Sequence, residues 1–449
     1  MNARHLAWML VLLLGGCATY QPLPLDQRAH AVDNPADIKV DPVVLHLFPQ
    51  RPHRFDPSHG LGMTDVAILA VANNPQLKLA RAERGIAHAQ AFAAGLLPDP
   101  VLDLARGVPT AGPSETSTFD LGLAYDVEAI LAHPLAVRAA KASEQAVDLN
   151  VLWMEWQVAG AARQLFVRAV YQAKMLALLR KEAGTLAWQH AQLTRASSEG
   201  DVSQTAVAAD LATLQAVEAR VHDTERQCLK TRQALDALLG LSPQVELHLT
   251  GPTAIQVPSD DTASRALATL SRRRPDLLAL QAGYHSADAR YRQAILQQFP
   301  AIQVGLSKAR DADGIYTRGL QVSLTLPLFN RNRGDIARAK ATRKKLHVEY
   351  TLRLTQAQDQ VEQILQDQKL LVQQRAQLQH ATASASATAQ RMRAIVTPGD
   401  VSSLTLAQLQ TNAWDRQLDV LAIDETMLEQ QAAVGTLLGE APPAEPIAK

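Results

Sequence analysis

An alternation of apolar and polar side chains near residue 310 most constrains how this chain can fold. Residues 300–329 read PAIQVGLSKARDADGIYTRGLQVSLTLPLF, with a polar turn at 311–314. The apolar positions on either side of the turn are Ile302, Val304, Leu306, Leu320, Val322, Leu324, Leu326 and Leu328. This period of two predicts a β-hairpin with one apolar face and one polar face. Strands of about ten residues suit either a half-buried hairpin or a lipid-facing one.

The same plan occurs about 200 residues earlier in the chain. Residues 100–128 hold a second predicted hairpin, in which Phe119, Leu121, Leu123, Tyr125 and Val127 alternate with Asp120, Gly122, Ala124, Asp126 and Glu128. Three further landmarks recur at nearly the same offset: Asn74-Pro75 with Arg274-Pro275, Gly200-Asp201 with Gly399-Asp400, and Leu238-Leu239-Gly240 with Leu437-Leu438-Gly439. A fixed offset across several landmarks indicates an internal duplication.

Two long helices are expected after each hairpin. Residues 335–396 contain neither glycine nor proline, and residues at intervals of seven form a mainly apolar seam. Its members are Tyr350, Ala357, Ile364, Leu371, Leu378, Ala385 and Met392, which correspond to Val151, Val158, Leu165, Gln172, Leu179, Leu186 and Leu193. Sustained heptads predict coiled-coil packing. At 1.5 Å per residue the longer helices would reach about 95 Å, and Cys228 is expected in their core.

These patterns divide the chain into six parts. We expect a signal peptide at 1–16, a lipidated tether at 17–60, a first repeat at 61–240, an inter-repeat segment at 241–261, a second repeat at 262–440 and a tail at 441–449. The repeats contain hairpins at 100–128 and 300–329 and helical hairpins at 130–240 and 331–439.

The N-terminus has the pattern of an exported lipoprotein. An apolar run at 6–14 ends in Leu14-Gly15-Gly16-Cys17, which resembles the lipobox that precedes an acylated cysteine. The run is too short for a permanent membrane helix. We therefore expect lipid on Cys17 and, because Ala18 follows, delivery to the outer membrane. An ordinary signal peptide with an incidental cysteine is the alternative.

Catalytic and metal-binding motifs are missing from the sequence. It has no H-E-x-x-H, G-x-S-x-G, phosphate-loop or C-x-x-C motif, so we expect neither an enzyme nor a cofactor beyond the lipid on Cys17. His46, His53 and His59 match no standard metal spacing and are read as solvated loop residues. The chain has 44 basic and 44 acidic residues, which gives no reason to expect nucleic acid as a partner.

Four amphipathic strands cannot close a membrane barrel, because the smallest barrels have about eight. Open strand edges in lipid would leave backbone groups unsatisfied at several kcal/mol each. Several chains must therefore contribute strands to one barrel if the hairpins span a membrane.

The lipobox, the RRPDL segment, the proline before each hairpin and the LTLPLFNRNRGDIARAKA passage resemble the TolC family of outer-membrane efflux proteins. The resemblance covers about residues 60–440. The NRNRG run is most similar to the members that serve cation-efflux pumps. The expected fold is therefore mainly α with a membrane β-barrel contribution: a homotrimer with a 12-stranded barrel and a periplasmic helical tunnel.

The resemblance implies a passive duct from an inner-membrane pump and a periplasmic adaptor to the exterior, for metal cations or drugs. A passive porin is disfavoured, because porins carry all their strands in one chain. A periplasmic coiled-coil scaffold lipoprotein that does not span the membrane is the alternative.

The resemblance also places the turns between the long helices at a periplasmic tip, where carboxylates can narrow the pore. These turns hold Gly200, Asp201, Gly399 and Asp400. Thr405 and Leu406 stand where relatives often carry further acids. N-capping of the returning helices is the simpler interpretation of both aspartates.

Overall fold

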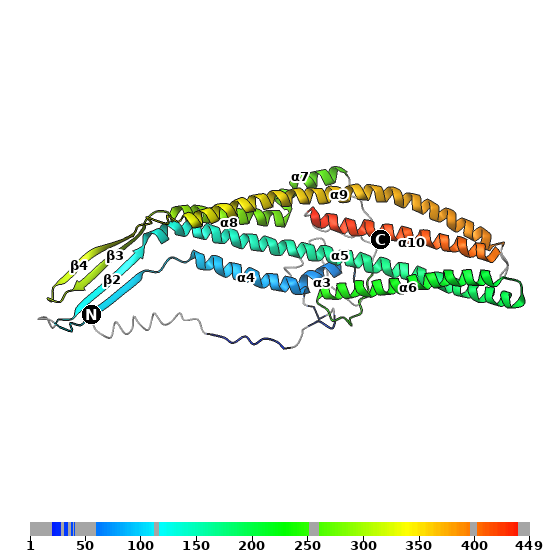
Figure 1. The fold of residues 1–449 in the computed structure, drawn as a ribbon, viewed down its shortest axis with the longest axis horizontal. Helices are drawn as coiled ribbons and strands as arrows, with labels where there is room; N and C mark the ends of the chain where they lie inside the picture. The colour runs from blue at the N-terminus through cyan, green and yellow to red at the C-terminus, as the bar shows by residue number, and fades with distance from the viewer. Residues whose placement is uncertain are drawn as a thin grey trace.

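The computed structural model describes residues 20–27, 31–34, 37–38, 40, 60–111, 116–250, 260–395 and 402–438. Cys17, the three tether histidines, Gly399 and Asp400 lie outside these ranges. The molecule is elongated, with strands at one end and the turn between α5 and α6 at the other (Figure 1). Within the part of the chain described, no helix combines the length and apolar character needed to cross a membrane.

The two halves of the chain have the same order of elements, so the predicted duplication is confirmed. The first half contains α3 (Met63–Asn73), α4 (Pro75–Gly95), β1 (Val101–Gly107), β2 (Thr118–Asp126), α5 (Val127–Glu199) and α6 (Gln204–Leu239). The second half contains α7 (Asp260–Arg273), α8 (Pro275–Leu296), β3 (Ala301–Arg310), β4 (Tyr316–Thr325), α9 (Arg333–Arg393) and α10 (Ser402–Leu437).

The four strands form one antiparallel sheet in the order β1-β2-β3-β4. The two hairpins join through β2 and β3, where Leu123 pairs with Leu306 and Tyr125 with Val304. The sequence predicted the hairpins but not this pairing between the halves. Alternation tells which face a side chain occupies, whereas it carries no information about which strand lies alongside.

The long helices pack along the heptad seams that the sequence predicts. Helix α5 has 73 residues and α9 has 61, which correspond to about 110 and 90 Å. On α5 the seam residues Val151, Leu179, Leu186 and Leu193 are buried, and so is the polar exception Gln172. Cys228 on α6 is only half-buried, whereas the sequence predicted that it would be buried in the core.

The repeated landmarks of the sequence meet in space where α3 breaks into α4. Asn74 caps α4 by accepting a hydrogen bond from the Leu77 amide, and Pro75 occupies the first turn. The Asn73 and Asn74 side-chain amides donate to the carbonyls of Leu239 (2.6 Å) and Leu238 (2.8 Å) at the end of α6. The Asn-Pro and Leu-Leu-Gly motifs therefore tie the short helices to the returning long helix.

Both predicted hairpins extend too far at their helical ends. Strand β2 ends at Asp126, whose carboxylate caps α5 through the Ala129 amide, so Val127 and Glu128 are helical. Strand β4 ends at Thr325, before Leu326 and Leu328. Pro327 has no amide hydrogen to donate to a neighbouring strand, which explains why the ladder stops there.

Candidate functional site: the sheet and the helical tip

In the part of the sheet nearer the helices, one face is apolar across all four strands and has no covering layer among the described residues. Toward the hairpin turns the same face carries Arg106, Lys308, Arg310 and Arg318. Register pairs Leu102 with Leu123 and Leu123 with Leu306, and the apolar row continues from Leu306 to Leu320. Leu306 is 68% exposed and Leu320 is 69% exposed. A contiguous apolar face of this kind marks a protein–protein or membrane contact.

The opposite face of the sheet is polar or small. Gln303 pairs with Ser323 and Gly305 with Gln321, while Asp103 lies opposite Gly122. Gly305 approaches β2 so closely that a Cβ there would lie 2.6 Å from the Leu123 carbonyl oxygen. The apolar and polar sides therefore segregate as the alternation predicted.

Strands β1 and β4 form the two edges of the sheet, and each pairs on one side only within the described residues. Strand β4 is exposed along its whole length. Free backbone N–H and C=O groups on an edge strand are a template for pairing with another chain. The chain thus offers two antiparallel-sheet edges at the end of the molecule where its apolar face lies.

The turn between α5 and α6 forms the far end of the helical hairpin. Gly200 has φ +87°, and the amides of Gly200 and Asp201 donate to the carbonyls of Ser197 (3.2 Å) and Ala196 (2.9 Å). These two bonds define a Schellman motif, which requires a left-handed residue that glycine supplies most readily. Val202 is buried beside Leu193 and closes the turn.

Asp201 does not cap the returning helix, so the capping interpretation is wrong for this residue. The cap of α6 is Ser203, whose hydroxyl accepts from the Ala206 amide at 3.3 Å. The Schellman motif occupies Gly200 and Asp201, so α6 begins at Gln204, two residues later than a cap at Asp201 would place it. The Asp201 side chain is exposed.

The long helices of the other helical hairpin end at different positions from those of α5 and α6. Helix α9 ends at Arg393 rather than at Gly399, and α10 begins at Ser402. Pro398 disfavours helical geometry at the residue before it, whereas the first repeat has Glu199 at the corresponding position. Gly399 and Asp400 lie outside the described residues, so their expected place at the tip stays a prediction.

A buried carboxylate lies between the two helical hairpins. Glu182 on α5 is fully buried, and neither of its carboxylate oxygens has a partner among the described residues. Burial raises its pKa to about 7, with Arg220 opposing the rise and Asp415 adding to it. Arg220 on α6 and Asp415 on α10 form an ion pair at 2.7 Å that links the hairpins.

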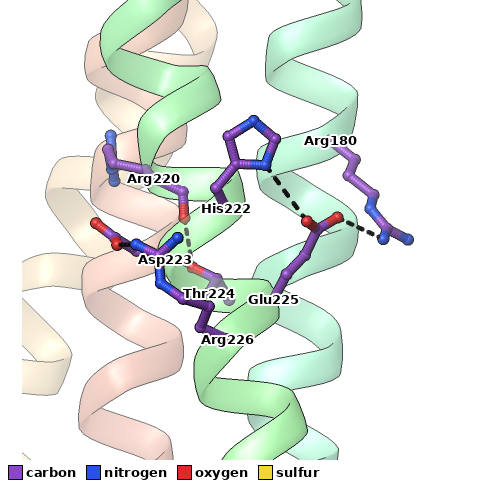
Figure 2. Close-up of polar contacts among 7 residues, drawn as sticks. All are labelled: Arg180, Arg220, His222, Asp223, Thr224, Glu225 and Arg226. Carbon is purple, nitrogen blue, oxygen red and sulfur yellow. Dashed lines mark hydrogen bonds and ion pairs between the residues drawn. The ribbon is translucent and has the colours of Figure 1, made fainter.

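The stretch of α6 that contains Arg220 also carries an exposed polar network (Figure 2). Arg180 on α5 donates to Glu225 at 2.8 Å, and His222 lies 3.5 Å from the same carboxylate. The Arg180 contact lowers the pKa of Glu225. These contacts connect α5 to α6, and no group of three or more possible metal ligands occurs within the described ranges.

Sequence reasoning missed Glu182, although a signal for it exists. Position 182 follows the seam residue Leu179 by three and precedes Leu186 by four, so it falls on the inward stripe of α5. An acidic residue at such a position is expensive to bury and is usually paired.

No family model and no curated protein matches the chain in sequence, whereas solved structures match its fold. The outer-membrane channel OprN has a TM-score of 0.72 at 16% identity, covering 95% of this chain and 100% of that one. The CmeC outer membrane channel of Campylobacter jejuni has a TM-score of 0.71 at 16% identity, covering 94% and 95%. CusC, whose structures concern transmembrane channel formation, has a TM-score of 0.70 at 18% identity, covering 84% and 92%. The predicted fold of the single chain is therefore confirmed: it has the fold of the TolC-type outer-membrane channels, while the trimer stays a prediction.

Proposed function

We propose that this chain is the outer-membrane duct of a tripartite efflux system. It would conduct solute passively from an inner-membrane pump, through a periplasmic adaptor, to the exterior. The observation that carries this proposal is the uncovered apolar face of a four-stranded sheet whose edge strands β1 and β4 are both open. Such a sheet is stable in lipid only if other copies close it into a barrel.

The number of copies follows from the resemblance to the TolC family. Three chains of four strands give a 12-stranded barrel, and α5, α6, α9 and α10 of each chain would build the periplasmic tunnel. The solute would be set by the pump that delivers it. The NRNRG run at 330–334 favours a metal-cation pump as the partner.

The experiment that tests this function uses outer-membrane fractions and planar bilayers. The duct predicts an oligomer that migrates differently before and after heating on a gel, together with stepwise conductance from the purified protein. A scaffold lipoprotein predicts heat-independent migration and no conductance. Heat-independent migration in outer-membrane fractions, together with no conductance from the purified protein, would therefore favour the scaffold.

We further propose that Cys17 carries the lipid anchor, on the strength of the Leu-Gly-Gly-Cys sequence. Diacyl and N-acyl chains together would hold the N-terminus firmly, because one chain alone binds only marginally. Metabolic labelling with a fatty acid should mark the wild type and leave Cys17→Ser unlabelled. Label that persists in Cys17→Ser would refute the anchor and leave the duct proposal intact.

A further inference from the structure

A set of cations without acidic partners lies on α9 immediately after the sheet. Arg333, Lys340 and Lys344 are exposed, and none of them forms an ion pair with a described residue. We call these three residues the basic row. At the corresponding positions of the first repeat, 199 residues earlier, stand Pro134, Lys141 and Gln145. The row therefore belongs to the second repeat alone.

The helical period places the basic row on one side of α9. Ile336, Ala339 and Leu346 are half-buried on the packed side, and the row lies roughly 100° around the helix from them. Arg338 and Lys345 lie on the other exposed side, where Arg338 is paired with Asp335 at 2.6 Å. The two sides of α9 therefore differ in uncompensated charge.

The neighbouring helix α8 presents two tyrosines on the side of the basic row. On the side of the basic row, the Arg343 guanidinium lies 4.8 Å from the centre of the Tyr291 ring, and Tyr284 lies 6.3 Å from the His347 ring. Tyrosines that are partly buried are typical of membrane–water interfaces. On the side of Arg338, Ser143, Arg290 and Gln293 contribute to the lining of a groove of about 550 Å³.

The basic row also lies close to the end of the apolar face of the sheet, where the lipid headgroups would begin. The apolar face of β4 ends at Leu324, and Phe329, which is 96% exposed, comes just before α9 in the sequence. From Arg333 to Lys340 the helix rises about 10 Å. The polar headgroup layer of each leaflet is about 5–8 Å thick, and long basic side chains reach back toward it.

We propose that the basic row binds the anionic headgroups of phospholipids in the periplasmic leaflet of the outer membrane. The proposal rests on the proposed function, since it requires the sheet to span the bilayer. A lipid phosphate would be held by Arg333 and Lys340, with Lys344 adding to the local positive potential. Clusters of lysine and arginine beside a membrane segment attract anionic lipid in this way.

The test compares two double variants with the same loss of charge: R333Q/K340Q in the basic row and R338Q/K345Q on the groove side. Each purified full-length protein is titrated with phosphatidylglycerol or with phosphatidylcholine of the same acyl chains, and retained lipids are counted by native mass spectrometry. The wild type and R338Q/K345Q should prefer phosphatidylglycerol. R333Q/K340Q should lose about tenfold in that preference.

Two results would overturn the proposal: no preference in the wild type, or an equal or larger loss in R338Q/K345Q. Heat-modifiable migration of each protein, measured in parallel, separates this inference from the proposed function. An oligomer that assembles in the membrane without lipid preference refutes only the headgroup site. A wild type that never assembles refutes the duct, and the headgroup site with it.

Discussion

At the residue scale, the Asp201 side chain does not cap a helix. Ser203 caps α6, and Asp201 sits exposed in the turn after Gly200. If Asp400 is placed similarly in the other turn, a trimer would present six carboxylates at the tip. We expect Asp400→Asn to lower cation selectivity in planar bilayers, with a smaller or similar effect from Asp201→Asn, because a carboxylate ring attracts cations and repels anions.

Ionic strength supplies the control for this selectivity prediction. Charges are screened over about 10 Å at 0.1 M salt, so the difference between wild type and variants should shrink as salt rises. Asp201→Asn should also leave the thermal stability of the oligomer unchanged, whereas Ser203→Ala should lower stability by about 1 kcal/mol. Unchanged selectivity in the double variant at low salt would remove both aspartates from the pore.

The buried carboxyl group of Glu182 leads to a prediction about how the stability of the folded protein depends on pH. Its pKa is raised from 4.5 to about 7, mainly by burial, so the folded state holds a proton that the unfolded state has lost. Stability is therefore greatest below about pH 4.5 and falls as the pH rises toward 7. Glu182→Gln should remove this part of the pH dependence and stabilise the oligomer at pH 8 by about 2 kcal/mol.

The measurement is the dissociation temperature of the oligomer across that pH range. Exposed Glu218 on α6 provides the matched control, and Glu218→Gln should follow the wild-type curve. Burial also raises the pKa of Glu425 to about 7. Glu425 is unchanged in every variant, so part of the pH dependence of stability should remain in all of them. A Glu182→Gln curve parallel to that of the wild type would mean that Glu182 is ionised in the folded protein.

At the scale of elements, β4 distinguishes a lipid-facing sheet from a soluble one. Val322 lies on the apolar face within β4, paired with Val304, and Ser323 lies on the polar face, paired with Gln303. Arginine at mid-strand on a lipid face costs about 2–4 kcal/mol, and much less on a lumen face. Val322→Arg should therefore reduce assembled oligomer in the outer membrane, while Ser323→Arg should assemble normally. Equal tolerance of both variants would argue for a hairpin in water.

The sequence predicted well those elements whose apolar residues recur at a regular interval. Alternation located the strands and their faces, and heptads located α5, α6, α9 and α10. Element ends were less predictable, because they depend on single contacts: Asp126 caps α5 within the expected strand, and Pro327 follows the end of β4. The pairing of β2 with β3 was not predictable, since it depends on tertiary contacts between segments about 180 residues apart.

The features of the candidate site also differ in how well the sequence predicted them. The exposed apolar face follows directly from the alternation at Leu320, Val322 and Leu324. The role of Asp201 was misjudged, because a Schellman turn and a serine cap fit the sequence Gly-Asp-Val-Ser as well as an aspartate cap does. Glu182 was missed, because its unpaired state depends on the packing of α5 against α6 and α10.

At the scale of the whole molecule, the separation of sheet and helices explains why one chain is incomplete. Helices α5 and α9 carry the helical hairpins about 90–110 Å from the sheet, so nothing at the helical end can cover the apolar face. The open edges β1 and β4 lie at opposite sides of the same sheet. Copies related by rotation would pair β4 of one chain with β1 of the next and close a barrel.

Cryo-electron microscopy of the full-length protein in lipid nanodiscs tests the account most directly. We predict three chains around one axis, a 12-stranded barrel within the bilayer in which β4 of each chain pairs with β1 of the next, and a lumen that continues between the long helices. A single chain or a dimer whose sheet lies outside the lipid would contradict the proposed duct.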